Sequence, residues 1–222
     1  MLASDIITPV RVVLNDVGGV HWSDTELLAW INDAQLLVAV LRPDSVAHTD
    51  TLAVVAGSKQ TIPADGIRLL DVIRNVGGRA IRIVDRDTLD LFDPNWHNGK
   101  PQKAIKNYVY DNRVPDTFYV YPQVAEGAEI EINYSKLPTK VDQTTDELAI
   151  NDIYKEIVIN YVLFRAYSKD AEHAANANLS TTYLQIVNSL TGVKLSKDVA
   201  FQPALNNRGT NPNAAAIQTG GV

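Results

Sequence analysis

The sequence predicts a mixed α+β fold: a helical bundle from the N- and C-terminal segments, an inserted β-rich subdomain and an extended C-terminal arm. Three observations predict it. Apolar residues recur at helical spacing near both ends of the chain, whereas in the middle they alternate as they do in strands. Close to the C-terminus, large apolar residues become rare. We therefore expect the bundle at residues 1–45 and 146–195, the β-rich insertion at residues 46–145, and the arm at residues 196–222.

Two helices are expected in the first segment. Helical spacing of apolar residues predicts one helix over residues 3–16, which either begins near Pro9 or is kinked there. A capping box, Ser23-Asp24-Thr25-Glu26, begins the second helix, and Pro43 marks its end. The apolar stripe of this second helix consists of Leu27, Trp30, Ile31, Ala34, Val38 and Leu41.

The middle segment carries strand and turn signals. Two hairpins are predicted, one from residues 51–55 and 59–62 and one from residues 67–76 and 79–84, each with glycine in its turn. A short helix is expected at residues 85–92, where Asp93-Pro94 ends it, and a loop follows. Alternating side chains predict further strands at residues 107–111, 117–121 and 128–134.

Two more helices complete the predicted bundle. Residues 151–169 are apolar nearly all round, which indicates a helix buried on more than one side, by its own domain or by a neighbouring subunit. Asp170 is placed to cap a following helix at residues 171–190, and Gly192 is a natural residue for the end of that helix.

The C-terminal residues after about position 199 are mainly Asn, Gly, Pro, Ala, Thr and Gln. Such a segment buries too little apolar surface to offset its own ordering entropy, so a disordered terminus is expected in an isolated monomer. The alternative is an arm that becomes ordered only against a partner. Phe201, Leu205 and Ile217 would then be its apolar anchors.

Composition excludes several classes of function. The chain of 222 residues has no cysteine, which excludes disulfides, thiolate metal sites and cysteine nucleophiles. A net charge of −6 without a clustered basic face argues against a protein that grips duplex DNA. The N-terminus does not read as a secretory signal, and the most apolar stretch, residues 153–167, is too short and too interrupted to span a membrane.

No group of side chains predicts catalysis, a metal site or a cofactor. The four histidines, at positions 21, 48, 97 and 173, lack metal-ligand spacing, and exposed surface positions are the better interpretation. A cluster of aspartates at positions 85, 87, 90 and 93 is interleaved with arginine, which favours a solvated helix end over a cation site. The strand aromatics lack interleaved Lys or Arg, which favours sheet core over a platform for stacking bases.

Several motifs, in this order and combination, resemble one family. The first are Trp22-Ser23-Asp24-Thr25-Glu26-Leu27-Leu28, Ile31-Asn32-Asp33-Ala34-Gln35 and Arg42-Pro43-Asp44. Gly57-Ser58-Lys59-Gln60, Leu89-Asp90, Pro94-Asn95-Trp96 and residues 115–122 and 161–170 follow. Over residues 22–195 the chain resembles the head-to-tail adaptor (connector) proteins of short-tailed bacteriophages, of the tail tubular protein A type.

The resemblance implies a non-enzymatic structural protein of the virion, made in the host cytoplasm and located at the portal vertex. It implies a homo-oligomeric ring, typically of twelve copies, that docks on the portal protein, extends the DNA channel and offers a platform to the tail or nozzle protein. Genome DNA would pass through without specific binding, and no membrane is involved. The residues expected to contact the portal are Phe201, Gln202, Pro203, Leu205, Arg208 and Ile217.

Three alternatives stay open at this point. An enzyme such as a tail-associated wall hydrolase would need a convergent catalytic set in a cleft. A nucleic-acid-binding module would show a steep salt dependence of its affinity for DNA. Another tail-tube, nozzle or tail-completion protein of the same particle is poorly separated from an adaptor by sequence.

Overall fold

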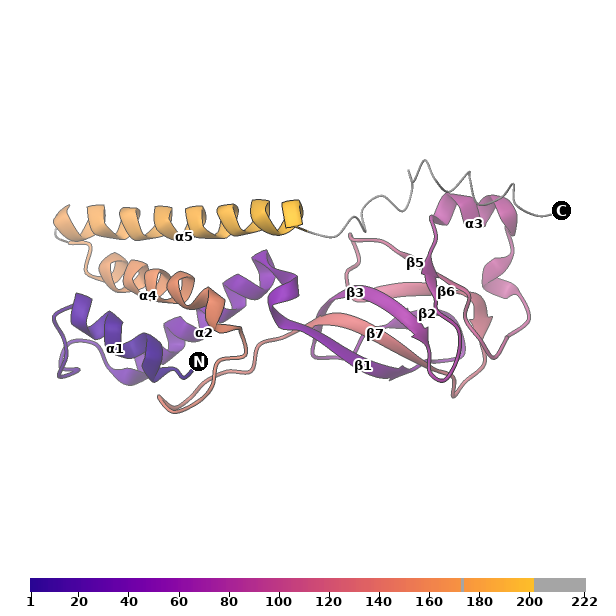
Figure 1. Cartoon of the computed structure of the whole chain (residues 1–222), viewed down its shortest axis with the longest axis horizontal. Helices are drawn as coiled ribbons and strands as arrows, with labels where there is room; N and C mark the ends of the chain where they lie inside the picture. Colours follow the sequence, from indigo (N-terminus) through magenta and orange to yellow (C-terminus); the bar gives the residue numbers. More distant parts are fainter. Residues whose placement is uncertain (173, 202–222) are drawn as a thin grey trace.

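The computed structural model describes residues 1–172 and 174–201. This part of the chain contains five α-helices and seven strands, an α+β fold as predicted. Figure 1 shows α1, α2, α4 and α5 at one end of an elongated molecule and the strands with the short helix α3 at the other. One hydrophobic core lies among the helices and a second lies within the β part. The unit boundaries expected near residues 45 and 145 stay a prediction.

The N-terminal helices are α1 (Ser4–Val13) and α2 (Asp24–Leu41). Pro9 lies inside α1, so of the two alternatives for this helix, a start near the proline is wrong. Ser23 caps α2 as predicted, because its hydroxyl accepts the N–H of Glu26 at 3.3 Å. The carboxylate of Glu26 pairs with Lys169 of α4. Leu41, expected in the buried stripe, is 44% exposed.

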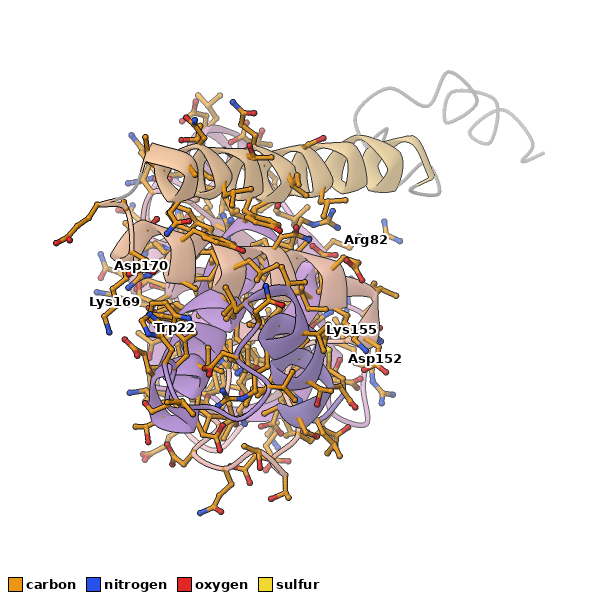
Figure 2. All side chains as sticks on the ribbon, turned by 90° about the vertical axis from the view of Figure 1, so that its left-hand side faces the viewer. Trp22, Arg82, Asp152, Lys155, Lys169 and Asp170 are labelled. Carbon is orange, nitrogen blue, oxygen red and sulfur yellow. The ribbon has the colours of Figure 1, made fainter. Side chains whose placement is uncertain are left out.

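The C-terminal helices are α4 (Lys155–Lys169), which follows the short turn η3 (Asp152–Tyr154), and α5 (Ala174–Phe201). Figure 2 shows α4 between α5 on one side and α1 and α2 on the other. Its buried side chains include Ile157, Val158 and Leu163. Contact on two opposite sides explains why this helix is apolar nearly all round.

Two predicted helix ends are wrong. Asp170 closes α4, where its N–H bonds to the carbonyl of Ala166, and α5 begins only at Ala174. Helix α5 then continues through Gly192 to Phe201, so residues 196–201, assigned to the arm, are helical. A glycine inside a helix costs about 1 kcal/mol relative to alanine. Better helix formers such as Lys194 and Leu195 follow it, so this cost does not end the helix.

The strands form two sheets, and their apolar faces share one core. Ile130 and Ile132 of one sheet and Phe118 and Val120 of the other are fully buried in the same cluster. All strand pairs are antiparallel except β4 with β5. The first sheet has the order β1 (Ala47–Ala53), β7 (Glu129–Lys136), β3 (Gly66–Asn75), and the second has the order β2 (Gly57–Thr61), β6 (Thr117–Val124), β5 (Asn107–Tyr110), β4 (Arg82–Ile83).

Neither predicted hairpin exists as a strand pair. Strand β1 pairs with β7 and β2 pairs with β6, so the chain crosses between sheets where a hairpin was expected. The side-chain amide of Gln60 makes this crossing possible, because it bonds to both the N–H and the carbonyl of Val55 at 2.9 and 2.8 Å. The second turn does form, with Gly77 at a φ of +66° and a bridge between Arg74 and Ala80. Beyond it, however, β4 joins β5.

Short helical segments complete the β part. Helix α3 (Arg86–Phe92) lies where the short helix was predicted, and Asp93 ends it. The loop predicted to follow contains a helical turn, η2 (Trp96–Asn98), which buries Trp96. Where the helical part and the β part of the molecule meet, η1 (Pro43–Val46) connects α2 to β1.

Candidate docking surfaces

The residues predicted to form the portal contact lie at or beyond the end of α5. Phe201 is the last residue of that helix. Figure 1 shows the C-terminal end of α5 pointing toward the β part of the molecule. The contact with a partner stays a prediction, because the other five residues lie outside the described part of the chain: Gln202, Pro203, Leu205, Arg208 and Ile217.

The motif Ile31-Asn32-Asp33-Ala34-Gln35 binds the segment that connects β7 to α4. The Nδ2 of Asn32 donates to the carbonyl of Val141, and its Oδ1 accepts the N–H of Val141, both at 2.9 Å. The Oε1 of Gln35 accepts the N–H of Ala149 at 2.8 Å. Gln35 is 1% exposed, so this bond is inaccessible to water. These two side-chain amides therefore hold the segment after β7 against α2, although the bonded residues are more than a hundred positions apart in the sequence.

A second motif, Leu89-Asp90 with Pro94-Asn95-Trp96, is also structural. Trp96 is buried against Leu89 and Val109, and its Nε1 donates to Asp90 Oδ1 at 2.7 Å. The ring of His97 stacks on the indole at 3.6 Å between centroids, and its Nδ1 lies 2.9 Å from the hydroxyl of Ser58. This arrangement pins α3 and η2 to the second sheet.

The Ser58–His97 pair is the arrangement most similar to a nucleophile and its base. Ser58 is buried at 8% exposure, which keeps its hydroxyl away from a substrate. In the part of the chain that the structure describes, His97 has no carboxylate to orient its other nitrogen; the nearby Asp90 bonds to Trp96 instead. The geometry of a catalytic triad needs such an orienting group. The pair therefore joins β2 to η2 rather than forming a catalytic set.

The other candidate groups are occupied by local structure. Asp90 pairs with Arg86 one turn away, and Asp93 accepts the N–H of Asn95. His21 and His48 are exposed, as expected, and His173 lies outside the described residues. Within the described ranges, no group of three or more His, Cys, Asp or Glu side chains is placed to hold a metal ion.

The loop before α2 is organised around the carboxylate of Asp16. It accepts the N–H groups of Val20, His21 and Trp22 at 2.8 to 3.1 Å, and Arg11 Nη1 lies 3.2 Å away. These hydrogen bonds, led by that of Trp22, lower the pKa of Asp16 below its ordinary value. They explain how Trp22 comes to be buried beside the capped start of α2.

A cleft of about 890 Å³ lies between the start of α3 and the turn that joins β5 to β6. Both signs of charge line it. Arg113 donates from Nε and Nη2 to the carboxylate of Asp111 at 2.6 to 3.0 Å, and this contact lowers the pKa of Asp111 to about 2. A carboxylate with so low a pKa is a weak general base near neutral pH. Asp111 is thus held as the partner of Arg113 rather than placed as a base in the cleft.

Two large apolar side chains project from the same region. Leu91 and Phe92, at the C-terminal end of α3, are 85% and 78% exposed. Ile83 and Val114, which line the cleft, are each 49% exposed. Figure 1 shows α3 at the end of the molecule opposite α1. Adjacent exposed apolar side chains of this size often mark an interaction surface.

The described helices include none long and apolar enough to cross a membrane. In a comparison with protein families, residues 1–208 match the model described as SU10 adaptor protein. No curated protein matches the chain. The family match covers both ends of the molecule and extends past the end of α5 into the predicted arm.

Proposed function

Because the chain belongs to the SU10 adaptor protein family, we propose that it is a head-to-tail adaptor that docks on the portal, extends the DNA channel and provides a platform for the tail. The family is one of structural proteins of phage particles, which makes the chain a component of a virion. The proposed ring of copies, its twelvefold number and its portal contact go beyond the family match. The match over residues 1–208 is the observation that carries the proposal.

The roles of the sequence motifs within this chain support a structural function. Asn32 and Gln35 close the helical end, Gln60 guides the chain between sheets, and Trp96 anchors α3. Each of these motifs thus stabilises a contact between two segments of the fold, and none of them directs a reactive side chain into the cleft. A protein whose work is to hold two larger assemblies together needs such joints.

The elongated shape offers separate surfaces to two partners. The exposed Leu91 and Phe92 at the tip of α3 suit a tail or nozzle protein. The 21 residues after Phe201 can span up to about 70 Å when extended. That reach allows the arm to contact a portal above the folded part. The net charge of −6 per copy would repel the phosphates of DNA passing through the ring.

Mixing the purified chain with its portal protein tests this function. Native mass spectrometry is expected to give one complex containing portal and several copies of the chain, and electron microscopy is expected to show a ring on one face of the portal. Free portal beside separate monomers would contradict the proposal. A complex with tail proteins but not with the portal would favour a tail-completion or nozzle protein instead.

The tip of α3 gives a separate prediction. Replacing Leu91 and Phe92 together by serine is expected to weaken binding of the tail protein by about tenfold or more, because exposed apolar anchors of this size often contribute over 1 kcal/mol each. Portal binding and the melting temperature should not change. Leu137→Ser is a matched control, because Leu137 is 52% exposed at another place. Equal tail affinity for both variants, measured by surface plasmon resonance, would exclude the tip as a docking surface.

A further inference from the structure

Helix α5 is unusual for an exposed helix because residues 174–193 contain no charged side chain and no histidine. Charged residues make up 21% of the chain, so about four would be expected in a stretch of this length. Only Ser180 and Val187 are fully buried between residues 174 and 192. Depletion of charge on a surface element is typical of the core of a protein–protein interface.

Apolar side chains follow one flank of this helix. Leu179, Ile186 and Leu190 are 39%, 36% and 36% exposed, and Tyr183 between them is half-buried. Their spacing of four, three and four residues is that of the seam in a coiled coil. We call these four residues the α5 stripe. Such a seam normally packs against a second helix with the same spacing.

A second exposed flank with the same spacing lies on α2. It consists of Ala29, Asp33, Leu36 and Val40, which we call the α2 stripe; Leu36 and Val40 are 45% and 59% exposed. Its one charged side chain, Asp33, lies 3.6 Å from Arg165 of α4. Both stripes cover eleven residue steps, about 16 Å of helix. They are therefore matched in length, in spacing and in low charge.

The two stripes lie on opposite flanks of the helical part. Tyr183 of the α5 stripe stacks on Tyr167 of α4, with ring centroids 5.6 Å apart and planes at 4°. Asp33 of the α2 stripe faces Arg165 of the same helix. Arg165 and Tyr167 are two residues apart on α4, so their side chains point about 200° away from each other around the helix axis. Since α4 lies between α5 and α2 (Figure 2), the two stripes border α4 on opposite sides.

We propose that the α5 stripe of one copy packs against the α2 stripe of the next copy, head to tail. The inference rests on the proposed adaptor function, for which it names the contact between neighbouring subunits. Stripes on opposite flanks leave each copy with one free stripe after it has bound a neighbour, and repeated contacts of this kind generate a ring or a filament.

Charge favours a second copy as the occupant of each stripe. Each copy carries a net charge of −6, so copies repel one another wherever charged surfaces meet. The α5 stripe carries no charge, and the one carboxylate of the α2 stripe, Asp33, is already paired with Arg165. Contact between these two stripes therefore adds little repulsion between copies. A portal or tail protein would have no need for two stripes of equal length and spacing on opposite flanks of one chain.

Cysteine cross-linking tests the contact directly, since the chain has no cysteine of its own. With the two stripes side by side in parallel, Ile186 of one copy faces Leu36 of the next, so the double variant Ile186→Cys/Leu36→Cys is oxidised, both alone and bound to the portal. A ladder of disulfide-linked oligomers is expected on a non-reducing gel. Each single variant should stay a monomer, and an equimolar mixture of the two single variants should give dimers only. The control Gln185→Cys/Leu36→Cys moves one cysteine to an exposed position off the α5 stripe, and the ladder should be lost.

The other outcomes overturn the proposal. Dimers from Ile186→Cys alone would mean that two α5 stripes pack against each other, and absence of a ladder in the portal-bound sample would mean that neither stripe contacts a neighbour. Formation of the portal complex is scored separately by native mass, so this contact can fail while the adaptor function stands. In addition, Ile186→Glu should reduce the number of copies on each portal, whereas Ser189→Glu, an exposed charge off the stripe, should not.

Discussion

Removal of residues 202–222 is expected to weaken binding to the portal by about 100-fold or more without destabilising the folded chain. Two large apolar residues of the arm, Leu205 and Ile217, lie in this segment. If each anchor contributes about 1.4 kcal/mol, which changes affinity about tenfold, the two together account for about 100-fold. The last residue of the described cores is Val187, so truncation should leave the melting temperature unchanged. Titration of labelled portal with each chain measures the loss.

Matched substitutions separate the anchors from the rest of the arm. Leu205→Ala/Ile217→Ala should reproduce most of the loss, while Asn206→Ala/Asn207→Ala, in the same segment, should have little effect. Full portal affinity of the truncated chain would show that the arm is not the portal contact. The truncated chain should still form the cross-linked ladder through positions 186 and 36, because that contact lies within the helical part.

The elements that sequence predicted well are those determined by neighbouring residues. The cap at Ser23 and the stop at Asp93-Pro94 act within one turn, and both lie as expected. Strand β7 follows from alternation, because a sheet with one buried face imposes a period of two on its side chains. Ile130, Ile132 and Tyr134 are accordingly buried, and Glu131 and Asn133 between them are not. Strand β5 lies where alternation predicted it, although both Tyr108 and Val109 are buried there.

Strand partners could not be predicted in the same way. A short glycine-containing loop between two strands is compatible with a hairpin and equally with a crossing between sheets. The partner of β1 is β7, where Ala47 pairs with Ser135, far away in sequence. The crossing depends on the hydrogen bonds of Gln60 to Val55, and nothing in the local pattern distinguishes that amide from an ordinary strand residue.

The docking surfaces were predicted only in part. Composition indicated the arm, but its first residues belong to α5, because propensity beyond Gly192 favours helix. The absence of charge in residues 174–193 was visible in the sequence. It becomes evidence for an interface only with the exposure of Leu179, Ile186 and Leu190, which depends on how α5 packs on α4. Leu91 and Phe92 likewise become evidence for a docking surface only through their exposure, because the last turn of a helix can be buried or exposed and the sequence does not distinguish the two.

Asn32→Ala is expected to lower the free energy of unfolding by about 2–4 kcal/mol, because two backbone groups of Val141 lose their partner at once. Val141 is 1% exposed, so water cannot replace the amide without opening the core. Urea unfolding followed by circular dichroism measures the change. Asn188→Ala, at an exposed position of α5, removes the same side chain and should change stability by less than about 0.5 kcal/mol.

Asn32→Asp separates the two hydrogen bonds. The carboxylate keeps an acceptor for the N–H of Val141, but it places a charged oxygen against the carbonyl of Val141, so near neutral pH the loss should be at least as large as that of Asn32→Ala. Protonation of the new side chain restores a donor, and the variant should recover stability relative to the unsubstituted chain as the pH falls toward about 4. A cost for Asn32→Ala no larger than that of Asn188→Ala would mean that this amide does not hold the helical end closed.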